Sequence, residues 1–260
     1  MISFTSAQLN AWLALYLWPF VRILAIVATH PVFGNRSIPA RVKVGLAGIL
    51  AILVAPGLDA PPAVEPGSAA GLLILAQQIL IGTAIGFSVR IVFTAVEMVG
   101  ELAGLGMGLG FATFYDPQNA GQTPIVAQFT SLLAILMFMA INGHQMVILA
   151  LAESFHELPV GMGPLVSKAW YAVALWGGEI FRVGVWLSLP VVTALLVTNL
   201  SIGIMTRAAP QLNIFAVGFP ITLMVGFFVL MLSLPLIMPL VGQLLQQGAG
   251  MMLNVPRLAR

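Results

Sequence analysis

The chain has 260 residues, of which 60% are apolar and only 7% carry a charge. A water-soluble domain carries roughly 25% charged residues because its surface must be solvated, so a soluble fold is excluded. The net charge of +2 comes from scattered basic residues, which argues against a nucleic-acid partner. The chain contains no cysteine, which removes disulfides, thiolate metal sites and cysteine nucleophiles from consideration.

Long uncharged stretches predict an all-α integral membrane protein. Residues 66–89, 117–152, 183–206 and 208–256 each exceed the roughly 20 residues that span a hydrocarbon core. These stretches are continuously apolar rather than alternating, which favours helices over the strands of a membrane barrel. We therefore expect a single polytopic membrane domain over residues 1–260.

The amino-terminal part is expected to form three membrane helices. The first, over about 9–29, is expected to be retained and to stop before Pro31, because proline disfavours helix in the preceding residue. The loop 33–43 carries three basic residues, so the positive-inside rule places it in the cytoplasm and the amino terminus outside. A short helix over about 42–55 and a third helix over about 69–96 follow.

The sequence becomes rich in glycine after Glu97. Gly100, Gly104 and Gly108 recur every fourth residue, a spacing that forms a flat ridge for close packing when it lies on a helix. Glu97 and Glu101 lie one turn apart on the same face. We favour helix packing over cation or proton binding for this pair, because no basic partner is evident.

The carboxy-terminal part is expected to hold one ordinary span, over about 125–151, and two overlong ones. The stretches over about 168–206 and 213–247 would extend well over roughly 50 Å at 1.5 Å per residue. We expect long helices that bend at proline, where packed neighbours satisfy the freed carbonyls. The candidate bends are Pro190 in the first and Pro220, Pro235 and Pro239 in the second.

Ionisable side chains inside the predicted helices are expected to face protein or water, because lipid exposure of a charge is costly. These residues are Arg22, Arg90, Glu97, Glu101, Glu179 and Arg182. Glu179 and Arg182 stand at i,i+3 spacing, which favours a structural ion pair over a transport site.

The residues give no pattern for a catalytic, metal or cofactor site. His144 and His156 lack flanking ligands at zinc spacing. The glycines from Gly104 to Gly110 lack the Lys-Ser/Thr ending and the preceding strand of a phosphate-binding loop. We therefore expect neither an enzyme nor a bound metal or cofactor.

Four segments stand out in order along the chain: Arg22 followed by HPVFGNRSIPARVKVGLA, then GLGFATFYDPQ, then NGHQMVILALAESFHELPVG, and then RAAPQLNIFAVGFP. Together they resemble the FliR family, the export-gate subunit of flagellar type III secretion systems. The resemblance extends along essentially the whole chain.

The resemblance implies partners and a place in the cell. One copy of such a subunit assembles with several FliP and FliQ copies into a right-handed helical spiral in the bacterial inner membrane, at the flagellar basal body. Its central pore passes unfolded flagellar proteins, and FlhB and FlhA are neighbours. The implied fold consists of kinked helical hairpins, similar to FliP over about 1–165 and to FliQ over about 166–260.

The resemblance also assigns two functional segments. The pore-plugging core loop of the family corresponds to residues 106–122. Its expected plug residues are Gly106, Met107, Gly108, Leu109, Gly110, Phe111, Phe114, Asp116 and Pro117. The cytoplasmic turn of the final hairpin corresponds to Arg207, Pro210, Gln211 and Asn213.

Three other functions stay open at this point. The homologous subunit of a virulence injectisome would share the fold and the gate role but pass a different cargo. A secondary transporter could use Glu97 and Glu101, although we find no inverted repeat of the kind that such proteins contain. A structural membrane scaffold without a pore is the third.

Overall fold

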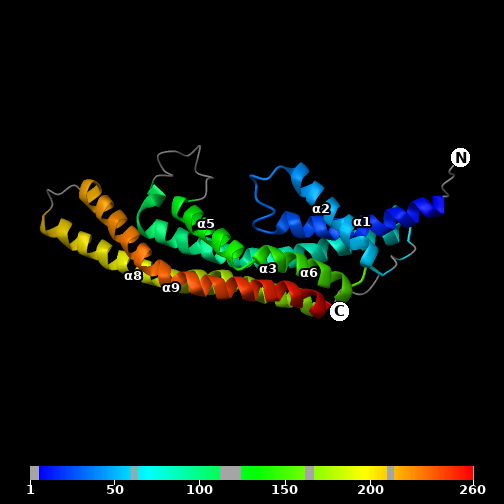
Figure 1. Ribbon diagram of the computed structural model, residues 1–260. Coiled ribbons are helices and arrows are strands. Elements are labelled where there is room, and N and C mark those ends of the chain that lie inside the picture. Colours follow the sequence, from blue (N-terminus) through cyan, green and yellow to red (C-terminus); the bar gives the residue numbers. More distant parts are fainter. Residues whose placement is uncertain are drawn as a thin grey trace. The chain divides into compact units, whose positions relative to one another are not determined.

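The computed structural model describes residues 6–59, 62, 64–111, 124–161, 167–209 and 214–259, and the regular structure within these ranges is entirely helical (Figure 1). The helices are α1 (Ser6–Thr29), α2 (Ala40–Val54), α3 (Ala69–Gly106), α5 (Ile125–Ala140), α6 (Gly143–Glu157), α7 (Ser167–Gly177), α8 (Glu179–Ala208) and α9 (Ile214–Ala259). Two 3-10 turns, η1 (Ala55–Gly57) and η2 (Leu109–Phe111), follow α2 and α3. The prediction of an all-α fold is confirmed.

Several of these helices are long and apolar enough to cross a membrane. Five stretches within the described residues qualify: Trp12–Thr29, Ala40–Gly57, Ala69–Gly106, Lys168–Ala208 and Ala216–Ala259. A sixth is present if α5 and α6 are taken together as one broken span. The prediction of a polytopic membrane protein is therefore confirmed.

The chain packs into two compact units. The first contains Met1–Ile91, Asn142–Gly177 and Leu245–Arg260, and the second contains Val92–Ile141 and Gly178–Leu244. The boundaries of these compact units differ from those of the expected parts, which are the FliP-like residues 1–165 and the FliQ-like residues 166–260. That likeness in fold stays a prediction.

In the first unit, α1 pairs with α2 and lies against the beginning of α3. A side chain at Gly82 or Gly86 of α3 would overlap atoms of α1, namely the carbonyl oxygen of Arg22 and the hydroxyl of Thr29. The two glycines, one turn apart, therefore allow the α1 and α3 backbones to approach closely.

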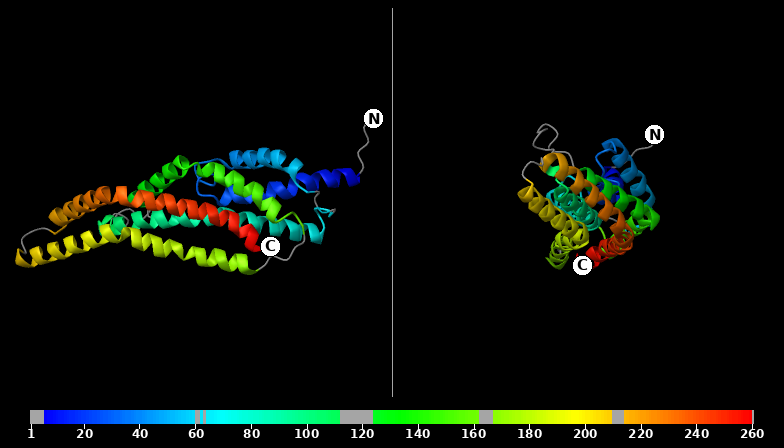
Figure 2. Two further views of the ribbon diagram at one scale, coloured as in Figure 1. Left: turned by 60° about the horizontal axis from the view of Figure 1, so that its bottom comes forward. Right: turned by 90° about the vertical axis from the view of Figure 1, so that its left-hand side faces the viewer.

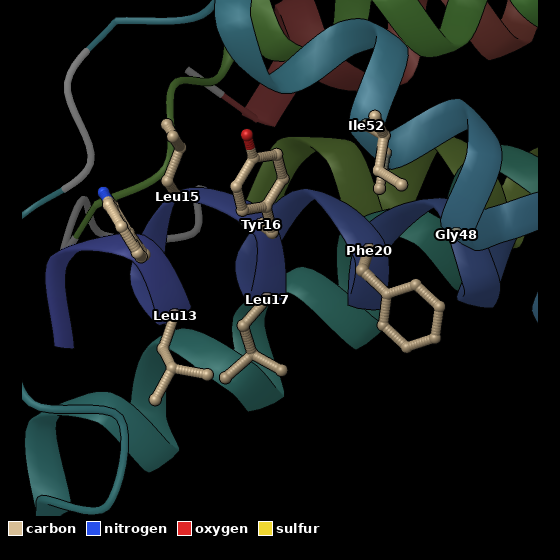
Figure 3. Close-up of a pocket in the computed structure, with 9 residues that line it drawn as sticks. Leu13, Leu15, Tyr16, Leu17, Phe20, Gly48 and Ile52 are labelled. Atoms are coloured by element: carbon tan, nitrogen blue, oxygen red, sulfur yellow. The ribbon is translucent and has the colours of Figure 1, made fainter. Parts of the chain in front are cut away.

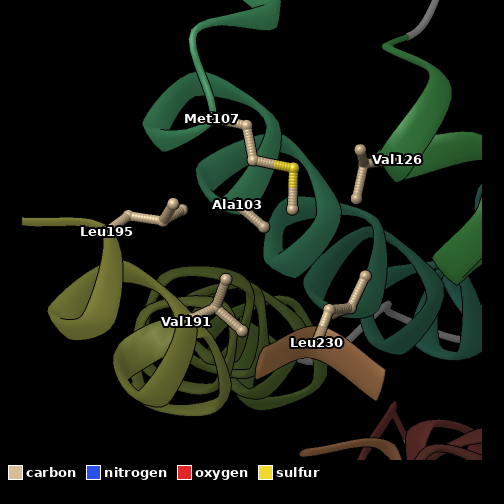
Figure 4. Close-up of a cluster of buried hydrophobic side chains, with 6 residues drawn as sticks. All are labelled: Ala103, Met107, Val126, Val191, Leu195 and Leu230. Atoms are coloured by element: carbon tan, nitrogen blue, oxygen red, sulfur yellow. The ribbon is translucent and has the colours of Figure 1, made fainter. Parts of the chain in front are cut away.

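In the second unit, α8 and α9 run side by side (Figure 2), and Gly218 of α9 approaches Ile202 of α8. A buried apolar cluster joins them to α3 and α5 (Figure 4). Its members are Ala103, Met107, Val126, Val191, Leu195 and Leu230. We call these six residues the Met107 cluster.

Two helices are longer than predicted. The third helix does not stop near residue 96 but continues as α3 to Gly106, and α9 continues past residue 247 to Ala259. Glycine costs a helix about 1 kcal/mol per residue relative to alanine, yet Gly100 is buried against α5 and its packing offsets that cost. Local glycine content was thus a poor guide to the end of α3.

Two expected spans are interrupted, and neither interruption is at proline. The span over 125–151 breaks between α5 and α6, where Asn142 adopts the left-handed conformation with φ of 57°. In the stretch over 168–206, α7 ends at Gly177 and α8 begins at Glu179, while Gly178 between them keeps helical backbone angles and α8 runs through Pro190 without a break. Asparagine tolerates the left-handed region better than most residues, and the Gly177-Gly178 pair weakens helix propensity.

Candidate functional site

Arg22 lies completely buried in the first unit, although it belongs to a membrane span. Its Nε donates to Gln78 Oε1 on α3 at 2.7 Å. One terminal nitrogen donates to the carbonyl oxygen of Ser154 at 2.7 Å, and the other donates to that of Leu158 at 2.8 Å. We call Arg22, Gln78, Ser154, Phe155 and Leu158 the Arg22 clasp.

The Arg22 clasp satisfies the guanidinium without a carboxylate. Its carbonyl acceptors belong to the last turn and the C-cap of α6, where the helix dipole places partial negative charge. The Phe155 ring lies under the guanidinium, with its centroid 4.3 Å from Cζ. The expectation that Arg22 faces protein is confirmed, but no sequence pattern indicated that α6 would supply its acceptors.

An open apolar groove of about 700 Å³ lies between α1 and α2 in the first unit (Figure 3). Apart from the Trp12 indole and the Tyr16 hydroxyl, its lining is aliphatic or aromatic carbon. Trp and Tyr of this kind are common at the membrane interface, where one end of the ring is apolar and the other is wet. The groove thus fits a membrane-facing surface and lacks the convergent polar groups of a catalytic pocket.

The beginning of the predicted plug segment is anchored in the second unit. Thr222 Oγ1 of α9 donates to the carbonyl oxygen of Met107 at 3.1 Å, and Asn199 Nδ2 of α8 donates to that of Gly106 at 3.5 Å. Two side chains from the final hairpin therefore satisfy carbonyls that the end of α3 leaves without helical partners. Gly108 follows with φ of 85°, the left-handed conformation that commonly terminates a helix.

Met107, one of the expected plug residues, is fully buried within the second unit. Its side chain lies at the centre of the Met107 cluster (Figure 4). A Cβ placed on Gly226 of α9 would lie 2.5 Å from Met107 Cγ, so the thioether fills the space above that glycine. The two residues that follow, Gly108 and Leu109, are half-buried.

Two further methionines repeat this arrangement within the second unit. Met98 packs over Gly184 of α8, and Met137 packs over Gly242 of α9, each within 3 Å of where a Cβ would be. Methionine is flexible and polarisable, so it can fill irregular gaps between helices. We call these three pairs the methionine–glycine contacts.

The glycine ridge is present in part. A Cβ on Gly100 would lie 2.5 Å from the Ala127 Cα, so α3 and α5 touch backbone to backbone there. At Gly104 the nearest atoms belong to Val126 at 3.7 Å, which is an ordinary contact. Gly108 lies beyond the end of α3 and is not part of a helical ridge, because its left-handed conformation turns the chain away.

The remaining predicted charges lie mostly on the surface of the chain. Glu179 and Arg182 form the expected ion pair, and 70% of the Arg182 side chain is exposed. Arg90 and Glu101 are exposed and have no hydrogen-bond or ion-pair partner among the described residues, whereas Glu97 is half-buried. The structure therefore does not bring Glu97 and Glu101 together in a buried carboxylate site.

Several predicted residues lie outside the described ranges. These are Phe114, Asp116 and Pro117 of the plug segment and Pro210, Gln211 and Asn213 of the hairpin turn. Arg207 is exposed in the last turn of α8, and Gly106, Gly110 and Phe111 lie at the end of α3 or in η2. Across the described part of the chain, no group of three or more His, Asp or Glu is placed to hold a metal ion.

Comparison with known proteins gives matches over nearly the full length. The family described as bacterial export proteins, family 1, matches residues 13–248. The flagellar biosynthetic protein FliR of Pectobacterium carotovorum subsp. carotovorum is 46% identical over 256 residues, which cover 98% of this chain and 97% of that protein. FliR of Escherichia coli (strain K12) is 45% identical over 92% of this chain and 91% of its own length. FliR of Bacillus subtilis (strain 168) is 32% identical over 85% and 86%.

Proposed function

Since this chain belongs to the FliR family of bacterial export proteins, we propose that it is the FliR-type subunit of a flagellar type III export gate. In this role it is a membrane component of the flagellar export apparatus rather than an enzyme. It assembles with FliP and FliQ in the bacterial inner membrane, near FlhB and FlhA, around a pore for unfolded flagellar proteins. The full-length match to FliR proteins is the observation that carries the proposal.

The uneven burial of the helices supports an assembly with other subunits. Within the chain, an apolar 18-residue stretch of Ala69–Gly106 is 67% buried, compared with 33% for such a stretch of Lys168–Ala208 and 28% for one of Ala216–Ala259. Lipid could cover apolar side chains, but it would not solvate the exposed Arg90, Glu101 or Arg182. Contacts with partner subunits, or a water-filled pore, would give these charges a suitable environment.

Purification from the membrane tests the assembly. We expect the chain to co-purify with FliP-like and FliQ-like subunits in a stable complex, and to lose heat resistance when it is isolated. An isolated chain that is monodisperse, helical and as heat-resistant as the complex would contradict the proposal.

The plug role of residues 106–122 is supported by how their first residues are held. Thr222, Asn199 and the Met107 cluster fix the end of α3, so the segment leaves from a defined point on the α8–α9 hairpin. Leu109, which follows the left-handed Gly108, offers apolar bulk for a constriction, and an apolar constriction can close a pore by excluding water. We propose that closure is made by residues after Met107, which itself serves as the anchor.

Single cysteines test the plug, because the chain has none of its own. In the assembled complex, Leu109→Cys should react slowly with a membrane-impermeant thiol reagent at rest and faster during secretion. Met107→Cys is the matched control and should stay protected in both states, because that position is buried. Equal labelling of Leu109→Cys in both states, together with an ion-tight complex after deletion of residues 109–114, would show an ordinary connecting loop.

A further inference from the structure

The turn between α1 and α2 carries positive charge that no acidic residue in the described part of the chain compensates. Arg36 and Arg41 are exposed, and the sequence contains no acidic residue before Asp59. Lys43 Nζ donates to the Gly34 carbonyl oxygen at 2.8 Å and thus bridges the turn. Arg36 and Arg41 make no hydrogen bond or ion pair with the described residues, so both guanidinium groups are available to an external ligand.

Local hydrogen bonds give this turn a defined shape. His30 Nδ1 accepts from the backbone N–H groups of Val32 and Phe33 at 3.2 and 3.4 Å. Asn35 Oδ1 accepts from the Ser37 N–H at 2.9 Å. Gly34 lies so close to the end of α1 that a Cβ would be 2.4 Å from the Ala28 carbonyl oxygen. The backbone carrying the arginines is therefore preorganised, which lowers the entropic cost of binding.

The turn leads directly into the first turn of α2, which contains Arg41. The N-cap residue is Pro39, and no side chain caps this helix start. The positive end of the α2 dipole therefore adds to the charge of the two arginines and favours an anion with several oxygen atoms, such as a phosphate.

Beyond the turn, α2 presents an aliphatic surface. Only 17% of Ala40–Gly57 is buried within the chain. The exposed side chains on α2 include Val42, Val44, Ile49, Ile52 and Leu53. Because α2 is a candidate membrane span, acyl chains of a lipid can pack against this surface. A free phosphate has no apolar part that could contact it.

We propose that the α1–α2 turn binds an anionic phospholipid at the cytoplasmic leaflet. Arg36 and Arg41 donate to the lipid phosphate, and the acyl chains lie along the exposed aliphatic residues of α2. The inference rests on the charge, shape and exposure of this hairpin, and it does not depend on the proposed export function.

The experiment compares phosphatidylglycerol with phosphatidylcholine. The full-length protein, in its native complex if it purifies as one, is titrated with each lipid in neutral detergent while lipid retention is followed by native mass spectrometry. We expect phosphatidylglycerol to bind more tightly than phosphatidylcholine. Since a cation near an anionic surface contributes roughly 1 kcal/mol, each arginine removed should weaken binding about fivefold, and Arg36→Gln with Arg41→Gln about 30-fold.

The controls separate this site from general electrostatic attraction. Lys168→Gln removes one exposed cation from α7 and should leave the preference for phosphatidylglycerol unchanged. Arg36→Lys with Arg41→Lys keeps the charge and should retain most of the preference. Inorganic phosphate at the same concentration should not displace the lipid.

Three results would overturn the proposal. The first is equal binding of the two lipids. The second is an equal loss of the preference in Lys168→Gln and in the double glutamine variant. The third is evidence that the two arginines bind another ligand. Such evidence would be displacement of the lipid by inorganic phosphate, or binding of an acidic protein partner by the arginines without any lipid preference.

Discussion

The two compact units hold their helices together by opposite means. In the Arg22 clasp, one buried cation joins three helices through directed hydrogen bonds to Gln78, Ser154 and Leu158. In the second unit, Met98, Met107 and Met137 each fill the space above a glycine on α8 or α9. The first arrangement depends on exact donor positions, whereas the second depends on volume.

This difference indicates how each unit should respond to change. Hydrogen bonds to a buried charge are lost as a set when the charge is removed, because the acceptors remain buried without donors. Methionine can change rotamer and refill a gap, so the methionine–glycine contacts should tolerate small movements of α8 and α9. A gate that opens needs such tolerance near its plug segment, and under the proposed function the second unit supplies it.

Replacement of Arg22 should have the largest effect on stability. Arg22→Ala leaves the carbonyl oxygens of Ser154 and Leu158 and the Gln78 Oε1 without their donors, and we expect a loss of at least about 3 kcal/mol in the free energy of unfolding. Arg22→Lys should recover little, because an ammonium cannot reproduce the planar fork. Thermal unfolding of the detergent-solubilised chain measures both.

Arg90→Ala is the matched control for Arg22→Ala, since Arg90 is exposed and has no partner among the described residues. It should change the stability of the isolated chain by no more than about 0.5 kcal/mol. Equal losses for the two alanine variants would show that the Arg22 clasp does not stabilise the first unit.

Met107 should show the opposite pattern, in which shape matters less than volume. Met107→Ala empties the centre of the Met107 cluster and should cost about 2 to 5 kcal/mol, whereas Met107→Leu should cost less than about 1.5 kcal/mol. The same unfolding assay applies. If leucine proved as damaging as alanine, the Met107 cluster would be as rigid as the Arg22 clasp and the contrast between the units would fail.

The sequence predicted the helices better than their ends and breaks. Apolar length alone located α1, α2 and the starts of α3 and α5, because lipid imposes that length on any span. The break at Asn142 and the extension of α3 through Gly100 depend on packing and on backbone conformation, which composition does not specify. Pro190 lies inside the long helix α8, as expected, and the bends expected at the prolines stay a prediction.

The candidate sites were predictable only in outline. The charge of Arg22 predicts that it needs a partner. Its acceptors, however, include backbone carbonyls 132 and 136 residues away, and no pattern of side chains predicts such acceptors. Met107 belongs to the glycine-rich segment that the sequence singles out, but its burial depends on Leu195 and Leu230, far along the chain. The ion pair of Glu179 with Arg182 was predictable because it is local.

The close approach of α3 and α5 should tolerate an added side-chain atom less well than the methionine–glycine contacts do. Gly100→Ala places a Cβ within 2.6 Å of the Val126 carbonyl oxygen and the Ala127 Cα, both backbone atoms, and should cost about 1 to 3 kcal/mol in unfolding free energy. Gly203→Ala in α8 meets no atom within 4 Å and should be neutral or stabilising by up to about 1 kcal/mol. Gly104→Ala should lie between the two. An equally harmless Gly100→Ala would mean that α3 and α5 can separate freely.

Mild acid should destabilise the first unit but not the second, and this loss of stability is the smallest effect that we expect. Burial lowers the pKa of His30, the residue that follows α1, to about 3 from its ordinary 6.5, and its Nδ1 accepts from the N–H groups of Val32 and Phe33. The folded state therefore favours neutral His30, so its contribution to stability is complete above about pH 6.5 and declines as the pH falls toward 3. Near pH 5.5 the loss of unfolding free energy should be about 1.4 kcal/mol.

His30→Gln keeps an acceptor but cannot gain the proton, so its unfolding temperature should depend less on pH between 6.5 and 5 than that of the wild type. The Met107 cluster contains no titratable side chain, so a Met107→Leu background should leave the wild-type pH dependence unchanged. Parallel pH curves for the wild type and His30→Gln would show that protonation of His30 does not destabilise the first unit.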